Sequence, residues 1–226
     1  IVDDVLTLSV DSSGALLHRR GYRLASAKAP IRETLAAAML LAMEWDGTVP
    51  LVDPLCGSGT IPIEAALLAR RIPPGWRRRF AFENWPEFKP TVWEYVRGEA
   101  EKEISARAAV PIVAADRDAG AVEACAANAE RAGVAGDLSI RRDALTATLF
   151  DLELAALPPG LVLTNPPYGV RVGESGRLRD LYASLGNAMR GPLAGWSLGF
   201  VTSDPALAAA TGLPLNAMLD TSTGGI

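Results

Sequence analysis

Short runs of apolar residues recur along the chain and end at polar residues, several of which are acidic. Residues 49–52 run into Asp53, residues 111–115 into Asp116, and residues 160–164 into Asn165. Continuous apolar runs of this length are typical of strands that are buried in a parallel sheet. Three further runs follow the same pattern, so we predict strands at 49–52, 111–115, 138–141, 160–164, 196–202 and 215–221.

Segments with apolar residues at helical spacing lie between these strands, at 31–44, 61–71, 118–132 and 178–189. Alternating strands and helices predict an α/β fold, with a mostly parallel, doubly wound sheet and helices on both of its faces. Near the start of the chain, two short apolar segments at 5–10 and 15–19 flank Asp11-Ser-Ser-Gly14. A turn of this composition between two such segments predicts an N-terminal β-hairpin.

The predicted elements divide the chain into a hairpin and linker at 1–28 and one domain at 29–226, with an insertion at about 72–110. The insertion carries three tryptophans and three consecutive arginines, and its latter half, 92–108, reads as a helix. We expect it to cap one face of the sheet with its tryptophans in the core. Its arginines are candidates for contacts with phosphate groups.

A glycine loop follows the first predicted strand and precedes a helix. Its sequence is Asp53-Pro54-Leu-Cys56-Gly57-Ser-Gly59-Thr60. Paired glycines between a strand and a helix have no side chains, so the main chain there can closely approach a nucleotide-like ligand. It is not a phosphate loop, because no lysine follows the glycines, and Asp53 would repel a pyrophosphate but attract an ammonium group. A ligand with an amino group and no phosphate is favoured, and S-adenosylmethionine fits this description.

The sequence Asn165-Pro166-Pro167-Tyr168 ends the fourth predicted strand. In a doubly wound sheet, a residue at this point faces the ligand crevice. The prolines remove two N–H donors, which leaves the Asn165 side-chain carbonyl and the Pro166 backbone carbonyl as acceptors, followed by an aromatic ring. This set suits a planar group with an exocyclic amine: both N–H bonds are accepted and the ring stacks on Tyr168.

Other residues at strand ends complete a predicted cofactor site. Asp116, followed by Arg117, can accept hydrogen bonds from two ribose hydroxyls. Asp143 can accept a bond from the adenine amino group, with the Ala144 backbone nearby. The sequence contains one histidine and two cysteines without metal-ligand spacing, so we predict no metal site.

Further motifs are Arg20-Gly-Tyr-Arg23, Ala29-Pro-Ile-Arg-Glu-Thr34 and Phe82-Glu-Asn-Trp-Pro86. Together with the glycine loop and Asn165-Pro-Pro-Tyr-Gly169, they make the chain resemble the class I S-adenosylmethionine-dependent methyltransferases. More narrowly, it resembles the bacterial 23S ribosomal RNA guanine-N2 methyltransferases, a family often labelled N6-adenine-specific DNA methylase.

This resemblance implies a Rossmann-like fold, a cytoplasmic enzyme, an RNA partner, and a place for Thr34 near the methionine carboxylate. The family's final antiparallel strand is not evident in this sequence. The family also carries an RNA-binding THUMP module before the catalytic domain. Because the chain opens directly on a predicted strand, without an initiator methionine, we interpret it as a piece of a longer protein without that module.

Composition limits the classes of partner that the chain is expected to bind. The net charge of −4 argues against a surface that coats nucleic acid broadly, although arginines gather at 19–23, 70–71, 77–79 and 171–179. No stretch is long and apolar enough to predict a membrane span. The motif chemistry leaves guanine N2, adenine N6 and a glutamine amide open as targets. A non-catalytic scaffold that binds S-adenosylmethionine and RNA is the remaining alternative.

Overall fold

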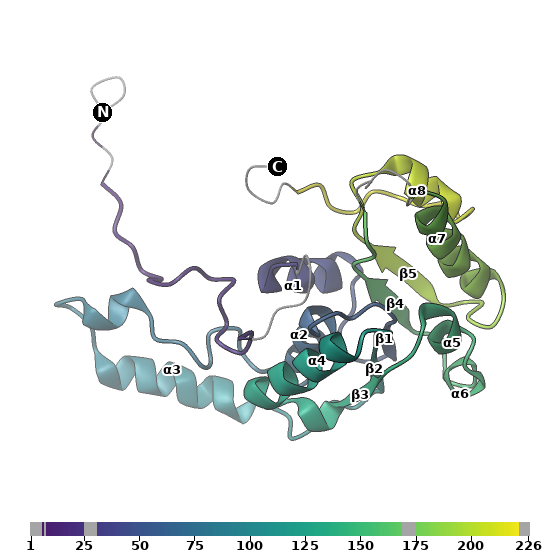
Figure 1. Cartoon of the computed structure of the whole chain (residues 1–226). Coiled ribbons are helices and arrows are strands. Elements are labelled where there is room, and N and C mark those ends of the chain that lie inside the picture. The colour runs from purple at the N-terminus through teal and green to yellow at the C-terminus, as the bar shows by residue number, and fades with distance from the viewer. Residues whose placement is uncertain (1–5, 7, 25–30, 169–174, 222–226) are drawn as a thin grey trace.

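The computed structural model describes residues 6, 8–24, 31–168 and 175–221. Its centre is a five-stranded sheet in which all neighbouring strands are parallel, in the order β3-β2-β1-β4-β5 (Figure 1). The strands are β1 Leu51–Asp53, β2 Ile112–Ala115, β3 Leu138–Arg141, β4 Leu161–Thr164 and β5 Ser197–Phe200. Five of the predicted strands are therefore confirmed. The strand order reverses between β1 and β4, which is where ligand crevices open in sheets of this type.

Alternate residues of the central strands face opposite layers of helices, as the two-residue period of a strand requires. Leu51, Ile112 and Leu161 belong to a core formed with helices α1, α2 and α4. Val52, Val113 and Val162 belong to a second core formed with α5, α6 and α7. Both faces of the sheet are thus covered, which explains why the strands read as continuous apolar runs. The bounds of these helices are α1 Glu33–Ala42, α2 Thr60–Ala69, α4 Ala119–Ala132, α5 Leu145–Leu149, α6 Leu152–Ala155 and α7 Ser175–Arg190.

Four of these helices, α1, α2, α4 and α7, were predicted, and α4 shows why its limits could be placed. The Asp118 side chain accepts a hydrogen bond from the Ala121 N–H at its start, and Gly133 ends it with φ of 73°. The short helices α5, α6 and α8 Pro205–Ala210 were not predicted, nor were the 3₁₀ turns Ala81–Asn84 and Ala135–Asp137. None of the helices described is long and apolar enough to cross a membrane.

The predicted N-terminal hairpin is wrong for the residues that the structure describes, since 8–24 contain no strand. The Asp11 carboxylate instead accepts bonds from the Ser13 and Gly14 N–H groups, which closes a local turn. The flanking apolar side chains stay exposed, Leu8 at 82% and Leu16 at 60%. A two-stranded hairpin needs a packed face to be stable, and this segment has none.

The predicted sixth strand is also wrong, because residues 215–221 form no strand. Leu215, Met218 and Leu219 are exposed there. An alternating apolar pattern forms a strand only where a neighbouring strand or a core receives it, and here neither does.

The insertion departs from its predicted role as a cap on the sheet. Its helix, α3 Pro90–Lys102, has no buried residue and extends away from the sheet in Figure 1. Trp93 packs edge-on against Phe80 and Phe82 at centroid distances of 5.8 and 5.1 Å, outside the two cores of the sheet. The tryptophans therefore do not belong to the main core. A separate aromatic cluster holds the insertion together.

Candidate functional site

The predicted site residues gather at the carboxyl edge of the sheet, on both sides of the point where strand order reverses. Asp53 ends β1, Asp116 follows β2, and Asn165 follows β4. Because β1 is paired with both β2 and β4, these three strand ends are neighbours. The topology alone thus brings together residues that are far apart in the sequence.

The glycine loop owes its shape to two residues in left-handed backbone conformation, Gly57 with φ of 54° and Gly59 with φ of 86°. A Cβ atom on Gly59 would lie 2.5 Å from Cys125 Sγ, so the loop also lies directly against α4. The Cys56 N–H donates to the Ala115 carbonyl at 2.9 Å. These contacts hold the loop across the end of β2, and the φ of Gly59 together with its approach to Cys125 explains why that position needs glycine.

Asp116 connects the glycine loop to the end of β2. Its Oδ2 accepts a hydrogen bond from the Gly57 N–H at 3.0 Å, and its Oδ1 accepts one from the Asp118 N–H at 2.9 Å. A carboxylate offers about four acceptor positions, so both oxygens can accept further bonds. The half-buried carboxylate is therefore held in orientation by the backbone while keeping capacity for a ligand.

Asp53 is 1% exposed, and its Oδ1 accepts hydrogen bonds from the Thr164 hydroxyl at 2.7 Å and from the Leu55 N–H at 3.2 Å. Burial raises the pKa of Asp53 from 3.8 to about 7, the two hydrogen bonds oppose this rise, and the charge of Asp116 adds to it. A buried carboxylate of this kind favours a cationic neighbour when it is ionised.

The side chain of Asn165 has an acceptor without a partner. Asn165 Oδ1 is buried, and no group in the described part of the chain donates a hydrogen bond to it. Pro166 is buried, whereas Pro167 and Tyr168 are exposed, Tyr168 at 40%. A buried acceptor that is left unpaired costs free energy, so such atoms in proteins commonly meet a ligand or a water molecule.

The remaining predicted residues, apart from Thr34, lie around this edge with fewer contacts. Pro54, Cys56 and Thr60 are buried within the glycine loop and the start of α2. The Asp143 N–H donates to the Asp116 carbonyl at 3.1 Å, which places Asp143 beside the end of β2. Ala144 and Arg117 are exposed nearby. Thr34 is exposed on the first turn of α1, and none of the hydrogen bonds described at this edge involves its side chain.

The two cysteines provide neither a nucleophile nor a metal ligand set. Both thiols are free and buried, and they pack together with Ala114. The hydrogen bond between them and their burial raise the pKa of the Cys56 thiol, so it stays protonated at neutral pH. Among the described residues, no group of three or more His, Cys, Asp or Glu side chains could hold a metal ion.

Two residues of the site were missed by the sequence reasoning. Thr164 binds Asp53 across 111 residues of sequence. Asn128 is 0% exposed, and its side-chain amide donates to the Ser58 carbonyl inside the glycine loop at 2.9 Å. Nothing in the local sequence could reveal either contact, because each depends on how distant strands and helices pack.

The arginines of the insertion have mostly internal partners. Arg78 lies over the Phe80 ring at 5.0 Å and donates to the Ser13 and Ala15 carbonyls of the N-terminal segment. Arg77 donates to the Arg131 carbonyl. The Arg79 side chain is 94% exposed and lies 3.6 Å from Glu83 Oε2, and Arg77 is exposed as well. The prediction that these arginines contact phosphate groups stays a prediction, and Arg78 is the member whose side chain is held by several internal contacts.

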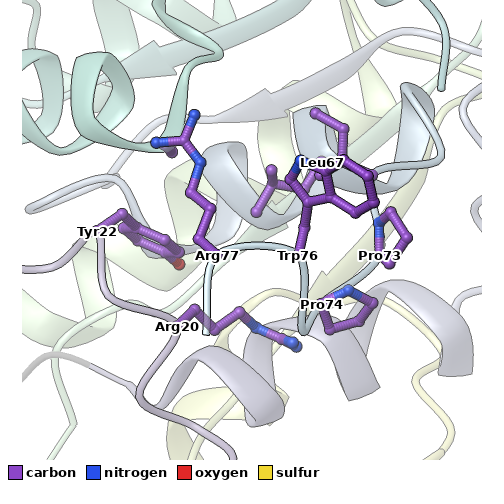
Figure 2. A pocket seen from close by; sticks show the side chains of 9 residues that line it. Arg20, Tyr22, Leu67, Pro73, Pro74, Trp76 and Arg77 are labelled. Atoms are coloured by element: carbon purple, nitrogen blue, oxygen red, sulfur yellow. The ribbon is translucent and has the colours of Figure 1, made fainter. Parts of the chain in front are cut away.

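A small cleft lies elsewhere, between the N-terminal segment and the Pro73–Arg77 loop (Figure 2). Leu67, in the last turns of α2, and Ala132, the last residue of α4, also line it. Both helices start at the carboxyl edge of the sheet and run back across it, so this cleft is remote from the candidate site. Arg20 reaches from its wall to Glu64 at 2.9 Å, and both side chains are buried. The cleft therefore lies beside a structural contact.

A family model, UPF0020, described as the RMKL-like methyltransferase domain, matches residues 20–219. The chain is 40% identical over 222 residues to the "Ribosomal RNA large subunit methyltransferase K/L" of Syntrophotalea carbinolica, covering 93% of this chain and 30% of that protein. It is 38% identical over 204 residues to the "Putative RNA methyltransferase YpsC" of Bacillus subtilis, covering 90% of this chain and 51% of that protein.

Solved structures agree with these relatives. SMU.472, described as "a putative methyltransferase complexed with SAH", superposes with a TM-score of 0.80 at 35% identity, over 89% of this chain and 51% of that one. A "predicted N6-adenine-specific DNA methylase" from Listeria monocytogenes gives a TM-score of 0.80 at 39% identity, over 89% of this chain and 52% of that one. The chain thus spans between 30% and 52% of the length of these four proteins.

Proposed function

The chain belongs to the RMKL-like methyltransferase domain family, and from this membership and the geometry of the site we propose that it transfers a methyl group from S-adenosylmethionine to the exocyclic amine of a nucleobase. The proposed target is guanine N2 in 23S ribosomal RNA. The motifs quoted above and a relative named as a ribosomal RNA large subunit methyltransferase support this choice. We further propose that residues 29–226 form the catalytic unit.

The observation that carries the proposal is the unpaired, buried Oδ1 of Asn165 at the end of β4. An exocyclic amine would satisfy it by donating one N–H bond, and the Pro166 carbonyl would accept the second. Tyr168 is exposed at the end of the same turn, where its ring can stack on a base that has left its helix. An acceptor pair followed by an aromatic ring is what an aromatic amine requires.

The other residues of the edge fit the proposed cofactor. Asp116 is oriented by two backbone N–H groups and retains acceptor capacity for ribose hydroxyls. The glycine loop brings backbone close to the same place, and Asp53 offers a carboxylate for the methionine ammonium. We propose that Thr34, Asp143 and Ala144 complete the site at the methionine carboxylate and the adenine ring.

When bound, S-adenosylmethionine supplies an electrophilic methyl group on a sulfonium sulfur. The lone pair of an aromatic amine is delocalised into its ring, which makes the nitrogen a poor nucleophile. Asn165 and Pro166 would hold both N–H bonds, draw the nitrogen toward a pyramidal geometry and aim its lone pair at the methyl carbon. The new C–N bond forms as the C–S bond breaks, and the nitrogen then loses a proton to solvent.

Methyl transfer to unmodified ribosomal RNA, measured with labelled S-adenosylmethionine, tests the proposal directly. We expect incorporation at similar rates with the wild type and with Asn216→Ala, a substitution at an exposed position outside the site, and incorporation about 10²–10³ times slower with Asn165→Ala. Mass spectrometry of the nucleosides then identifies the base. N2-methylguanine supports the proposal, whereas N6-methyladenine would show that the target is adenine instead of guanine. Cofactor binding without transfer to any RNA would favour the non-catalytic scaffold.

A further inference from the structure

We infer that Thr164 is a positioning residue that acts through the Asp53 carboxylate, and that it thereby joins the cofactor side of the proposed site, at Asp53, to the amine side, at Asn165. This inference rests on the proposed function. The Thr164 hydroxyl donates a hydrogen bond of 2.7 Å to Asp53 Oδ1. Thr164 is 0% and Asp53 1% exposed, so water does not compete for this bond. Thr164 directly precedes Asn165 in the chain, and Asp53 is the first residue of the glycine loop.

The backbone does not make this connection by itself. The pairing between β1 and β4 includes Leu51 with Leu161 and Val52 with Val162, and it ends there. Beyond these pairs, the hydrogen bond between the two side chains continues the link to the edge where both ligands would lie. Thr164 is also the polar member of an otherwise apolar strand, Leu-Val-Leu-Thr. Valine would pack equally well at this position, so packing does not explain why the residue carries a hydroxyl.

The hydroxyl also acts on the charge of Asp53. It donates to the carboxylate and so favours the ionised form, as does the Leu55 N–H. Burial and the charge of Asp116 act in the opposite direction. The Cys56 thiol also lies close enough to interact with Asp53. Because the proposed partner of Asp53 is an ammonium group, a change in its ionisation would change cofactor binding and transfer together.

Replacing Thr164 with Val removes the hydroxyl with little change of shape, and replacing it with Ser retains the hydroxyl. A hydrogen bond to a charged group changes an ionisation equilibrium by about tenfold, which moves the pKa of Asp53 upward by about one pH unit. We therefore expect kcat/KM of Thr164→Val to fall about fivefold at pH 7 and about tenfold at pH 6, and to approach the wild-type value at pH 9. Thr164→Ser should follow the wild-type profile.

Thr211→Val is the matched control, because Thr211 is also 0% exposed and its hydroxyl also donates a bond, to the Ala208 carbonyl. It lies at the end of α8, outside the site. The control should leave the pH profile of kcat/KM unchanged. If Thr164→Val loses activity equally at every pH, then the hydroxyl does not act through the ionisation of Asp53, and the inference is overturned.

A second measurement separates failure of the inference from failure of the proposed function. The carboxyl carbon of Asp53, assigned by comparison with Asp53→Asn, is titrated by ¹³C NMR in the wild type and in Thr164→Val without any ligand. If the midpoint moves upward by about one pH unit, the inference is supported even if the wild type transfers no methyl group. Absence of methyl transfer by the wild type would refute the proposed function alone. Identical midpoints in the two proteins would refute the inference even in an active enzyme.

Discussion

Replacing Asp53 with Asn tests how much stability the fold loses by burying this carboxylate. The two side chains have the same shape, and an amide oxygen can still accept the hydrogen bonds that the Thr164 hydroxyl and the Leu55 N–H donate to Asp53 Oδ1. The substitution therefore removes the negative charge while it retains the local bonds. The side chain is 1% exposed, so solvent does little to screen the charge.

The expected magnitude follows from the pKa, which burial raises from 3.8 to about 7. Because this pKa is higher in the folded state, folding favours the protonated Asp53 carboxyl. Its contribution to stability is therefore complete below pH 3.8 and is lost as the pH rises through about 7. Above that pH, the ionised group destabilises the folded state by about 4 kcal/mol, at about 1.4 kcal/mol per pH unit. Part of this loss is already present at pH 5. The free energy of unfolding of Asp53→Asn, relative to the wild type, should therefore be about 2–3 kcal/mol higher at pH 8 than at pH 5.

Urea unfolding of both proteins at pH 5 and pH 8 provides this double difference. Effects of the substitution that do not depend on pH cancel in it. Groups that titrate in both proteins also cancel, including Glu64, whose pKa burial raises to about 7. A stability difference that is the same at both pH values would show that Asp53 carries no such cost. Affinity for S-adenosylmethionine, measured by calorimetry at pH 8, should fall in the same variant, so that stability rises while binding weakens.

Three other predictions concern single side chains. Asn165→Ala should slow methyl transfer by about 10²–10³ while S-adenosylmethionine still binds, because the side chain is proposed to touch the amine. Single-turnover rates measure this effect, and a variant that keeps half the wild-type rate would contradict the prediction. Asp116→Ala should weaken S-adenosylmethionine binding by about 1–3 kcal/mol in calorimetry, and undiminished affinity would exclude its contact with the ribose. Arg79→Glu should weaken RNA binding and lower the slope of log affinity against log salt by about one. It should change stability little, because the Arg79 side chain that pairs with Glu83 is 94% exposed. Arg78→Glu should instead lower the unfolding midpoint, because it breaks the contacts to Ser13 and Ala15.

The three central strands, β1, β2 and β4, could be predicted because they are buried on both faces. Such strands need no alternation, so each reads as an apolar run, and the polar residue that ends it marks the edge of the sheet. The limits of α4 could be placed for a local reason, since Asp118 and Gly133 form its caps. The alternation of strands and helices predicts a parallel sheet with right-handed crossovers, but the order of the strands, which decides where the site lies, came from the structure.

The errors share a different cause. The hairpin and the sixth strand were inferred from apolar residues such as Leu8 and Leu215, which remain exposed because no other element covers them. Local pattern does not say whether a partner exists. Arg78 shows the same limit for charge: a run of three arginines resembles a phosphate-binding surface, but this member lies over a phenylalanine ring and binds backbone carbonyls.

The position of β1 beside β4 explains why one hydrogen bond can matter for both proposed ligands. A cofactor held at Asp53 and an amine held at Asn165 can react only if the two strand ends keep a fixed spacing, yet the backbone pairing stops at Val52 and Val162. The Thr164 hydroxyl acts at this point, and it does so through a carboxylate that is costly to bury. If the two effects are linked in this way, then Thr164→Val in an Asp53→Asn background has no carboxyl group left to titrate. Its effect on transfer should then lose its pH dependence, and whatever remains measures the contribution of the hydroxyl to alignment alone.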